Sequence, residues 1–364
     1  MRGMQMQSND AMSPFFSIIV PCCDVAPYVR ECLGSVKGQT FADWECIAVV
    51  ETSKDDTERV VRECAADDGR FKVFTEPRSG SPATPRNTGL DHACGEYVVF
   101  LDGDDFLAEG SLGRLAARIR ERPQADLFPC AFHDWREGRG SVRIVDNWPA
   151  SAPPEMSGTD SLVQMFGHVH TPVSGAQFTV YRRAFLEKAG LRFVPGLVYE
   201  DLEFLPRAFC PARRVAPLHE PFYMYRTRAD SIMGASRAAG PKMEHYARVL
   251  RSLFAFHASI AKKPGFDAEL SRLFGRSWIA LLRTVWFSPS SVASATRARR
   301  LETLREVFAG GFGDFRALLS AASLSRRVAG WCIMAFVRFP PLRGIAETFL
   351  VRIYSNLAWR RRGR

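Results

Sequence analysis

The N-terminal third of the chain alternates short apolar runs with segments whose apolar positions recur at helical spacing. Residues 16–20 (FSIIV) form a continuous run rich in β-branched residues, closed by Pro21, which indicates a buried parallel strand. Apolar positions at helical spacing then continue to Gly38. The same alternation predicts strands at residues 46–50, 71–74 and 97–101 and helices at residues 57–66 and 83–93. This order predicts an α/β fold, with a mostly parallel, doubly wound sheet flanked by helices.

The middle of the chain is less regular. Its apolar runs and loop-forming residues predict a strand at residues 126–132, a loop at residues 147–154, and a strand at residues 178–181 that enters a helix at residues 182–188. From residue 242 onward, apolar residues recur at helical spacing. We therefore expect an α/β domain at residues 14–234 and a helical C-terminal region at residues 235–364, with the boundary between residues 234 and 240.

Polar residues follow three of the predicted strands, at residues 21–24, 51–55 and 102–105. Ligands of doubly wound sheets bind at the carboxyl ends of the strands, so these three segments are the candidate site. The third segment carries Asp102, Asp104 and Asp105 within four residues. Crowded carboxylates repel one another unless a cation or a row of donors neutralises them, and a hard ion such as Mg²⁺ or Mn²⁺ suits oxygen ligands. The alternative is a solvated Asp-Gly turn.

The amino-acid composition indicates the cellular compartment of the protein. The nine cysteines include no C-x-x-C pair and lie mostly among apolar neighbours, as reduced thiols of a reducing compartment do. The first fifteen residues lack the apolar run of a secretory signal, and no apolar run reaches the length of about 18 residues that a membrane-spanning helix needs. We expect a cytoplasmic protein.

The net charge of +10 is concentrated at the C-terminus, where residues 314–364 hold ten arginines and two acidic residues. Short apolar helical pieces lie beside these arginines and tryptophans, a pattern typical of a helix at the surface of an anionic membrane. A packed helical domain with a solvated basic tail is the alternative. Nucleic-acid binding is not expected, because no known nucleic-acid-binding module accompanies the charge.

Residues 16–106 resemble the nucleotide-sugar half of a family 2 glycosyltransferase with the GT-A fold. The resemblance rests on five blocks in the family's order, from the first strand, turn and helix to the acidic cluster. The blocks include Gln39-Thr40, Arg86-Asn87 with Gly89-Leu90, Gly95-Glu96-Tyr97 and Asp102 to Asp105. A single D-x-D motif is weak support, but ordered blocks at the family's spacing are specific. The resemblance implies a GT-A catalytic domain that binds a nucleotide-diphosphate sugar, with a UDP-sugar favoured.

The resemblance also implies roles for single residues on the donor side. Asp104 corresponds to the direct metal ligand, Asp102 to the residue facing the ribose and metal, and Arg86 to a residue near the diphosphate. A bound dication and an arginine stabilise the charge that a leaving nucleoside diphosphate gains. For Arg86, the alternative is a surface arginine that caps its own helix.

The nucleobase side departs from the family. The resemblance assigns donor contacts to Pro21, Cys23, Glu51 and Asp55, but Cys23 stands where an aromatic residue often stacks on the base. Glu51 stands at the second of two acidic positions, where the family contacts the base, and Val50 replaces the first.

On the acceptor side, Glu200-Asp201 resembles the family's Glu-Asp motif. An inverting transfer needs a carboxylate that takes the proton of the acceptor hydroxyl, and we assign Asp201 to this role with Glu200 in support. Both acids also suit the N-terminus of a helix. Arg226 and Arg228 belong to a segment that resembles the family's closing Tyr-x-x-Arg motif, where they could cover the diphosphate as a lid; a solvated basic loop is the alternative.

The sequence thus predicts an inverting, metal-dependent glycosyltransferase that acts on a hydroxyl acceptor, either lipid-linked or part of a cell-surface polymer such as a polysaccharide or teichoic acid. It would lie in the cytoplasm or peripherally at the inner face of the cell membrane. No Gln-x-x-Arg-Trp motif occurs, which disfavours a processive synthase. Two alternatives are a GT-A-fold binding module without turnover and a sugar nucleotidyltransferase, although the latter would need a Gly-rich phosphate loop after the first strand.

Overall fold

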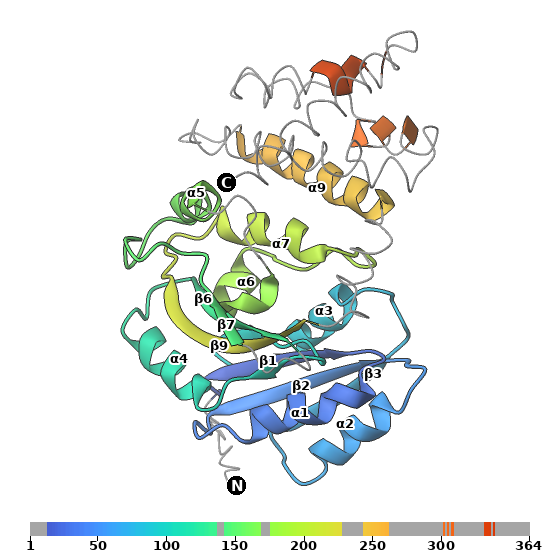
Figure 1. Cartoon of the computed structure of the whole chain (residues 1–364), viewed down its shortest axis with the longest axis vertical. Helices are drawn as coiled ribbons and strands as arrows, with labels where there is room; N and C mark the ends of the chain where they lie inside the picture. Colours follow the sequence, from blue (N-terminus) through green and yellow to red (C-terminus); the bar gives the residue numbers. More distant parts are fainter. Residues whose placement is uncertain are drawn as a thin grey trace, which may run out of the picture.

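The computed structural model describes residues 13–136, 142–168, 175–227 and 243–261, together with short stretches between residues 301 and 338. Its centre is a nine-stranded mixed sheet with helices on both faces (Figure 1). The predicted α/β fold is confirmed. The predicted boundary at residues 234–240 lies outside the described residues, and the division into two regions stays a prediction.

The N-terminal half of the sheet is parallel, with strand order β3-β2-β1-β4. Its strands are β1 (Phe16–Cys22), β2 (Trp44–Glu51), β3 (Phe71–Glu76) and β4 (Tyr97–Phe100). They are joined by helices α1 (Ala26–Lys37), α2 (Thr57–Ala65) and α3 (Ala83–His92). The chain moves outward from β1 to β3 and then returns to the other side of β1. The crevice between the ends of β1 and β4 is therefore the topological switch point, where such sheets bind ligands.

The second half of the sheet is mixed, which the sequence pattern did not predict. β8 pairs antiparallel with β4 and with β6, while β9 runs parallel to β6. The strands of this half are β5 (Phe106–Leu107), β6 (Leu127–Arg136), β7 (Val142–Val145), β8 (Thr179–Arg182) and β9 (Leu218–Thr227). The pairing of β5 with β9 places the segment after the acidic cluster beside a strand more than a hundred residues away.

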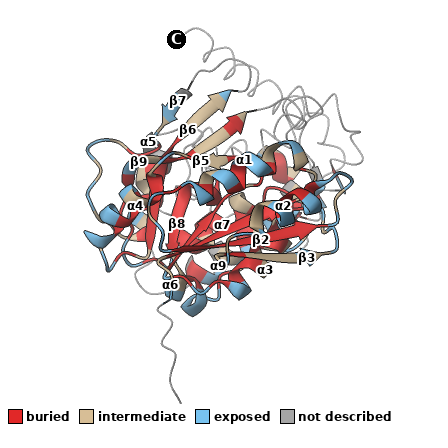
Figure 2. Ribbon diagram, turned by 90° about the horizontal axis from the view of Figure 1, so that it is seen from below, coloured by how far each residue is buried: buried red, intermediate tan, exposed pale blue. Residues whose placement is uncertain are grey.

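Alternate positions along the strands supply two cores. Ile18 and Val20 face the core under α1 and α2, whereas Ile19 faces the core on the opposite side of the sheet, as the two-residue period of a strand requires. The first core also includes α4 (Ser111–Arg120). The second includes α3, α5 (Gly158–His168), the 3₁₀ turn η1 (Ala176–Phe178), α6 (Arg183–Lys188) and α7 (Glu200–Phe209). The central strands are accordingly buried on both faces (Figure 2).

Two glycines of the sequence motifs permit close approach of helix and sheet. A Cβ on Gly89 would lie 2.2 Å from Cγ2 of Ile19, so α3 packs directly on β1. A Cβ on Gly95 would lie 2.6 Å from the backbone nitrogen of Ser17. A side chain at position 89 would displace the side chain of Ile19, and one at position 95 would require a shift of the backbone. These glycines therefore bring α3, which carries Arg86, against the strand that leads to the switch point.

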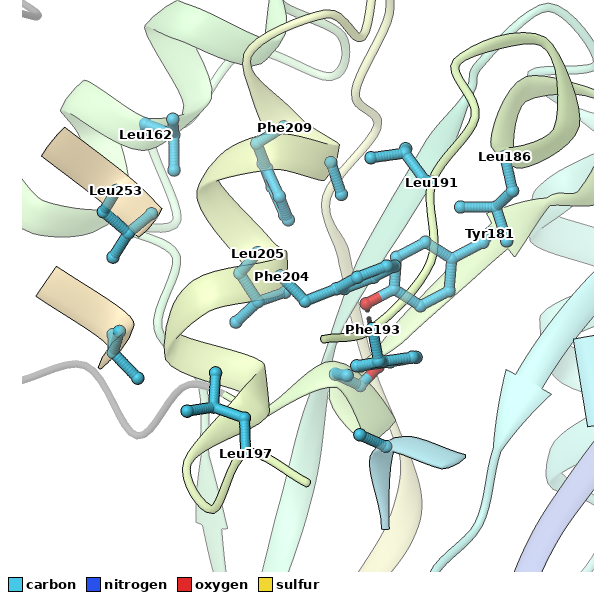
Figure 3. Close-up of a cluster of buried hydrophobic side chains, with 14 of the residues drawn as sticks. Leu162, Tyr181, Leu186, Leu191, Phe193, Leu197, Phe204, Leu205, Phe209 and Leu253 are labelled. Carbon is cyan, nitrogen blue, oxygen red and sulfur yellow. Dashed lines mark hydrogen bonds between the residues drawn. The ribbon is translucent and has the colours of Figure 1, made fainter. Parts of the chain in front are cut away.

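The C-terminal helix α9 (Met243–Ala261) packs on α7 and extends the second core. Figure 3 shows Leu253 of α9 facing the side of α7 that carries Leu205. Both leucines are almost completely buried, and Phe204 of α7 stacks on Phe193 with 4.0 Å between ring centroids. Within the part of the chain that the structure describes, no helix is both long and apolar enough to cross a membrane.

Candidate active site

The loops after β1 and β4 meet at the switch point. A Cβ on Gly103 would lie 3.0 Å from the carbonyl oxygen of Pro21, so the turn at residues 102–105 sits directly against the end of β1. The thiol of Cys32 in α1 lies 3.6 Å from the carbonyl oxygen of Asp102. The structure therefore brings together Pro21 and the acidic cluster, two features predicted separately from the sequence.

Arg86 joins this loop to the acceptor-side motif. Its guanidinium donates to Oδ1 of Asp102 at 2.6 Å and to Oε1 of Glu200. Only 2% of the Arg86 side chain is exposed, so the surface-arginine alternative is wrong. Burial opposes the positive charge, but the carboxylates of Asp102 and Glu200 outweigh burial and raise the pKa of Arg86. Three of the predicted site residues thus form one charged group, in which Arg86 and Glu200 are buried and Asp102 is partly exposed.

Glu200 and Asp201 begin helix α7, after Tyr199 in the left-handed conformation at φ 67°. Burial raises the pKa of Glu200, and Arg86 limits this rise. Asp201 is partly exposed. Burial and the neighbouring charge of Glu200 raise the pKa of Asp201 to about 7. A carboxyl group whose pKa lies near neutrality suits a general base, because it accepts a proton at working pH and holds it well.

Asp105 is the anchor of the acidic turn rather than one of its open carboxylates. It is 2% exposed, its Oδ2 accepts the hydroxyl of Tyr223 at 2.6 Å, and its Oδ1 accepts the backbone N–H of Arg226 at 2.7 Å. The Tyr223 hydroxyl oxygen also accepts the N–H of Asp102 at 3.1 Å. Burial and the charges of Asp104 and Asp102 raise the pKa of Asp105 well above its usual range. Asp105 and Tyr223 therefore fix the turn to β9.

Arg226 lies in β9, beneath the acidic turn. Its Nε donates to the carbonyl oxygen of Asp104 at 2.8 Å, and its guanidinium pairs with Glu31 of α1. The same guanidinium lies 4.4 Å from the ring centroid of Trp135. A buried arginine held by three elements is part of the scaffold, which does not support the lid interpretation for this residue; its donor role stays a prediction. Arg228 lies outside the described residues.

The predicted nucleobase side lies at the ends of β1 and β2. Glu51 is 3% exposed, and its Oε1 accepts the N–H of Ser79 at 2.6 Å. Cys23 is partly exposed. Burial raises the pKa of its thiol, while the charge of Arg78 opposes this rise and that of Glu51 adds to it. Arg78, which the sequence analysis missed, pairs with Asp24 at 2.7 Å. The roles of Cys23 and Glu51 in base recognition stay predictions.

Asp55 has a well-defined role in the fold. Its Oδ2 accepts the N–H of Ala26 at 3.0 Å, and its Oδ1 accepts the N–H and the hydroxyl of Thr57. The carboxylate therefore satisfies donors at the first residues of both α1 and α2. Its predicted contact with the donor stays a prediction.

Asp102 and Asp104 are the partly exposed carboxylates of the acidic turn at the end of β4, whereas Asp105 is buried. Among the described residues no three His, Cys, Asp or Glu side chains gather into a metal-ligand cluster. Two oxygen ligands with open positions fit Mg²⁺ or Mn²⁺, because such ions keep waters and take phosphate oxygens as further ligands. The residues therefore fit a metal that binds together with a phosphate-containing ligand.

This fold and site define a GT-A-type glycosyltransferase, and comparison with known proteins agrees. Residues 17–190 match the family described as glycosyl transferase family 2. The chain is 30% identical over 229 residues to a beta-1,3-glucosyltransferase of Campylobacter jejuni that acts on GalNAc(5)-diNAcBac-PP-undecaprenol; the match covers 62% of this chain and 70% of that protein. This chain belongs to glycosyl transferase family 2. The nucleotidyltransferase alternative is wrong.

Two further comparisons concern a sequence relative and a solved structure. The chain is 30% identical over 229 residues to the uncharacterized glycosyltransferase EpsJ of Bacillus subtilis, a match that covers 61% of this chain and 63% of EpsJ. The crystal structure of residues 1–349 of TarS from S. aureus, in complex with UDP-GlcNAc, matches with a TM-score of 0.70 at 22% identity, covering 94% of this chain and 91% of that one. This likeness shows that the two chains share a fold.

Proposed function

We propose that this protein is an inverting, metal-dependent glycosyltransferase that moves a sugar from a UDP-sugar to a hydroxyl group of a lipid-linked or polymeric cell-surface acceptor. The observation that carries the proposal is the buried Arg86, which pairs with both Asp102 and Glu200. This pairing supports a single site that contains the donor-side carboxylates and the acid pair of α7. Asp201, with a pKa of about 7, is then the candidate base beside that site.

The transfer is a single displacement at C1 of the donor sugar. Asp201 takes the proton of the acceptor hydroxyl, the hydroxyl oxygen bonds to C1 of the donor sugar, and the C1–oxygen bond to the diphosphate breaks. The electron pair of that bond leaves with the nucleoside diphosphate. Arg86 orients Glu200 and favours its ionised form, and the negative charge of Glu200 favours proton uptake by Asp201.

Asp104 and Asp102 are the residues that would hold the divalent metal. When bound, Mg²⁺ or Mn²⁺ supplies positive charge that stabilises the leaving diphosphate. The chain's own contribution is the fixed turn, since Asp105, Tyr223 and Arg226 hold it before any ligand arrives. A preorganised site of this kind spends little free energy on reordering when charge develops.

The comparisons support the choice of donor and acceptor. TarS, which is named a poly(ribitol-phosphate) beta-N-acetylglucosaminyltransferase, has been crystallised with UDP-GlcNAc. The Campylobacter relative is named for an undecaprenol-linked acceptor. Relatives with polymeric or lipid-linked acceptors favour a site of action at the inner face of the cell membrane for this chain as well.

The test is release of nucleoside diphosphate from a panel of sugar nucleotides, with Mn²⁺ present and then chelated. The proposal predicts release from at least one UDP-sugar, lost on chelation. If calorimetry detects donor binding but no donor turns over with a panel of polyprenyl-linked and polymeric acceptors, the binding-module alternative is correct. Metal-independent transfer would contradict the assignment of Asp102 and Asp104.

A further inference from the structure

The candidate base depends on a backbone segment with unusual geometry. Residues 193–199 lead directly into α7, and within them Gly196 and Tyr199 have positive φ angles of 63° and 67°. Tyr199 is the residue before Glu200 and Asp201. A non-glycine residue at positive φ is uncommon and persists only where surrounding contacts hold it. The contacts of this segment therefore decide where Asp201 lies.

One side of the segment is held by α3. The side-chain amide of Asn87 donates to the carbonyl oxygen of Phe193 and accepts the N–H of the same residue, both at 2.9 Å. Asn87 follows Arg86, which binds Glu200. Two consecutive residues of α3 thus fix both ends of the segment, at Phe193 and at Glu200.

The other side is held by α9, from the C-terminal region. Nδ1 of His245 accepts the N–H of Val198 at 3.0 Å. Arg248 donates to the carbonyl oxygens of Gly196 at 2.8 Å and Pro195 at 3.2 Å. These two residues are three positions apart, so they lie side by side on one face of the helix.

The same face of α9 also contacts α7 itself. Ser252, four positions after Arg248, donates its hydroxyl to Oε1 of Glu203 at 2.6 Å. Glu203 is 1% exposed and lies one turn from the helix start, where its carboxylate also accepts from Arg207. Beneath these polar contacts, buried Leu253 packs in the core that includes Leu205 (Figure 3). Helix α9 therefore contacts both the segment and the first turns of the helix that carries Asp201.

We propose that α9 is a clamp for the candidate base, with His245 and Arg248 as positioning residues that set the place of Asp201 through the backbone of residues 195–198. The inference rests on the proposed function, since Asp201 is the base only in that account. It gives the C-terminal region a part in catalysis besides any contact with a membrane. A displacement of a base by as little as an ångström slows transfer strongly.

The test compares His245→Ala, His245→Asn and Arg248→Ala in the full chain, with Arg251→Ala as the control. Asn places an acceptor oxygen at the position of Nδ1, so it restores the bond to Val198. Arg251 is an exposed arginine of the same helix, which matches Arg248 in type and setting. The measurements are kcat and KM for the donor, UDP affinity by calorimetry, and hydrogen exchange of the Val198 amide.

The expected result is a fall in kcat of roughly tenfold to a hundredfold in His245→Ala and Arg248→Ala, with donor KM and UDP affinity unchanged. Val198 exchanges faster in His245→Ala, while His245→Asn restores kcat and the slow exchange. Unchanged kcat in both alanine variants, or a loss that Asn does not restore, overturns the clamp. If the wild-type protein shows no turnover, the proposed function is contradicted. The clamp is tested separately by hydrogen exchange, and unchanged exchange of the Val198 amide in His245→Ala contradicts it.

Discussion

Arg86 donates to Asp102 across 2.6 Å, and through this contact the donor loop is joined to the helix that carries the candidate base. The second half of the bridge is the ion pair between Arg86 and Glu200. Charges buried in this way are costly unless every one of them is paired. A single arginine that neutralises one carboxylate from each side makes the two halves of the site mutually dependent.

Removing Arg86 is therefore expected to damage stability and donor binding together. Arg86→Met leaves Glu200 buried without its partner, which lowers the free energy of unfolding by about 3 to 5 kcal/mol. Urea denaturation measures this loss, and calorimetry measures UDP affinity. Lys72→Met is the matched control, because it strips the buried Glu45 of its cationic partner at 2.6 Å. The account is contradicted if Arg86→Met and Lys72→Met affect UDP affinity equally.

The dependence of activity on pH reports the protonation of Asp201. Because burial and the charge of Glu200 raise the pKa of Asp201 to about 7, kcat/KM rises as pH increases through that value. Glu200→Gln removes a charge that disfavours ionisation of Asp201, so it lowers the pKa and moves the rising limb to lower pH. The pH profiles of the two proteins make the comparison. A limb that stays in place or moves upward in Glu200→Gln argues against Asp201 as the titrating group.

Tyr223 is expected to control the metal site without touching the metal. Tyr223→Phe removes both the donor to Asp105 and the acceptor for the N–H of Asp102, which costs about 1 to 3 kcal/mol of stability. The turn then keeps only its bonds to Arg226 among those to β9, so it is held less firmly and Mn²⁺ affinity measured by calorimetry with UDP also falls.

The control for this variant is Ser17→Ala. The buried Ser17 hydroxyl likewise donates to a carboxylate, that of Glu45, and accepts an N–H, that of Gly95. Comparable destabilisation is expected, with Mn²⁺ affinity unchanged. Equal effects of the two variants on Mn²⁺ affinity would remove the positioning role of Tyr223.

Asp104→Ala tests whether metal binding by Asp104 can be distinguished from the structural role of Asp105. We expect donor binding to lose its dependence on Mn²⁺, because the carboxylate at this position is the proposed metal ligand. Stability should change little, within about 0.5 kcal/mol, since Asp104 is partly exposed. Thermal unfolding and UDP titration with and without Mn²⁺ provide the readouts. Mn²⁺-dependent binding that survives in this variant would exclude Asp104 as the ligand.

The parallel half of the fold was predictable from the sequence because its signals are local. Each strand from β1 to β4 contains a short apolar run, and helices α1 and α2 show apolar positions at helical spacing. The acidic cluster was also found in this way, since it directly follows a buried strand. In the mixed half, the strands predicted at residues 126–132 and 178–181 are present as β6 and β8. Their pairing was not predictable, because the contact of β6 with β9 joins residues about ninety positions apart and leaves no local pattern.

The roles within the acidic cluster needed the structure. The family resemblance assigns roles to Asp102 and Asp104 but none to Asp105, and only the contact with Tyr223 in β9 identifies Asp105 as the anchor. The resemblance to the family's Tyr-x-x-Arg motif assigned roles to Arg226 and Arg228 but none to Tyr223. Similarly, nothing local marks His245 as a partner of Val198, because 47 residues separate them.

The most direct test of the central claim is the rate of UDP release from the active UDP-sugar by wild-type protein and by Asp201→Asn, each with saturating acceptor and Mn²⁺, beside donor affinity by calorimetry. The account predicts a loss of roughly 100-fold to 10,000-fold in kcat for Asp201→Asn, with donor affinity unchanged, because only proton transfer is removed. Transfer at the wild-type rate by Asp201→Asn would contradict it.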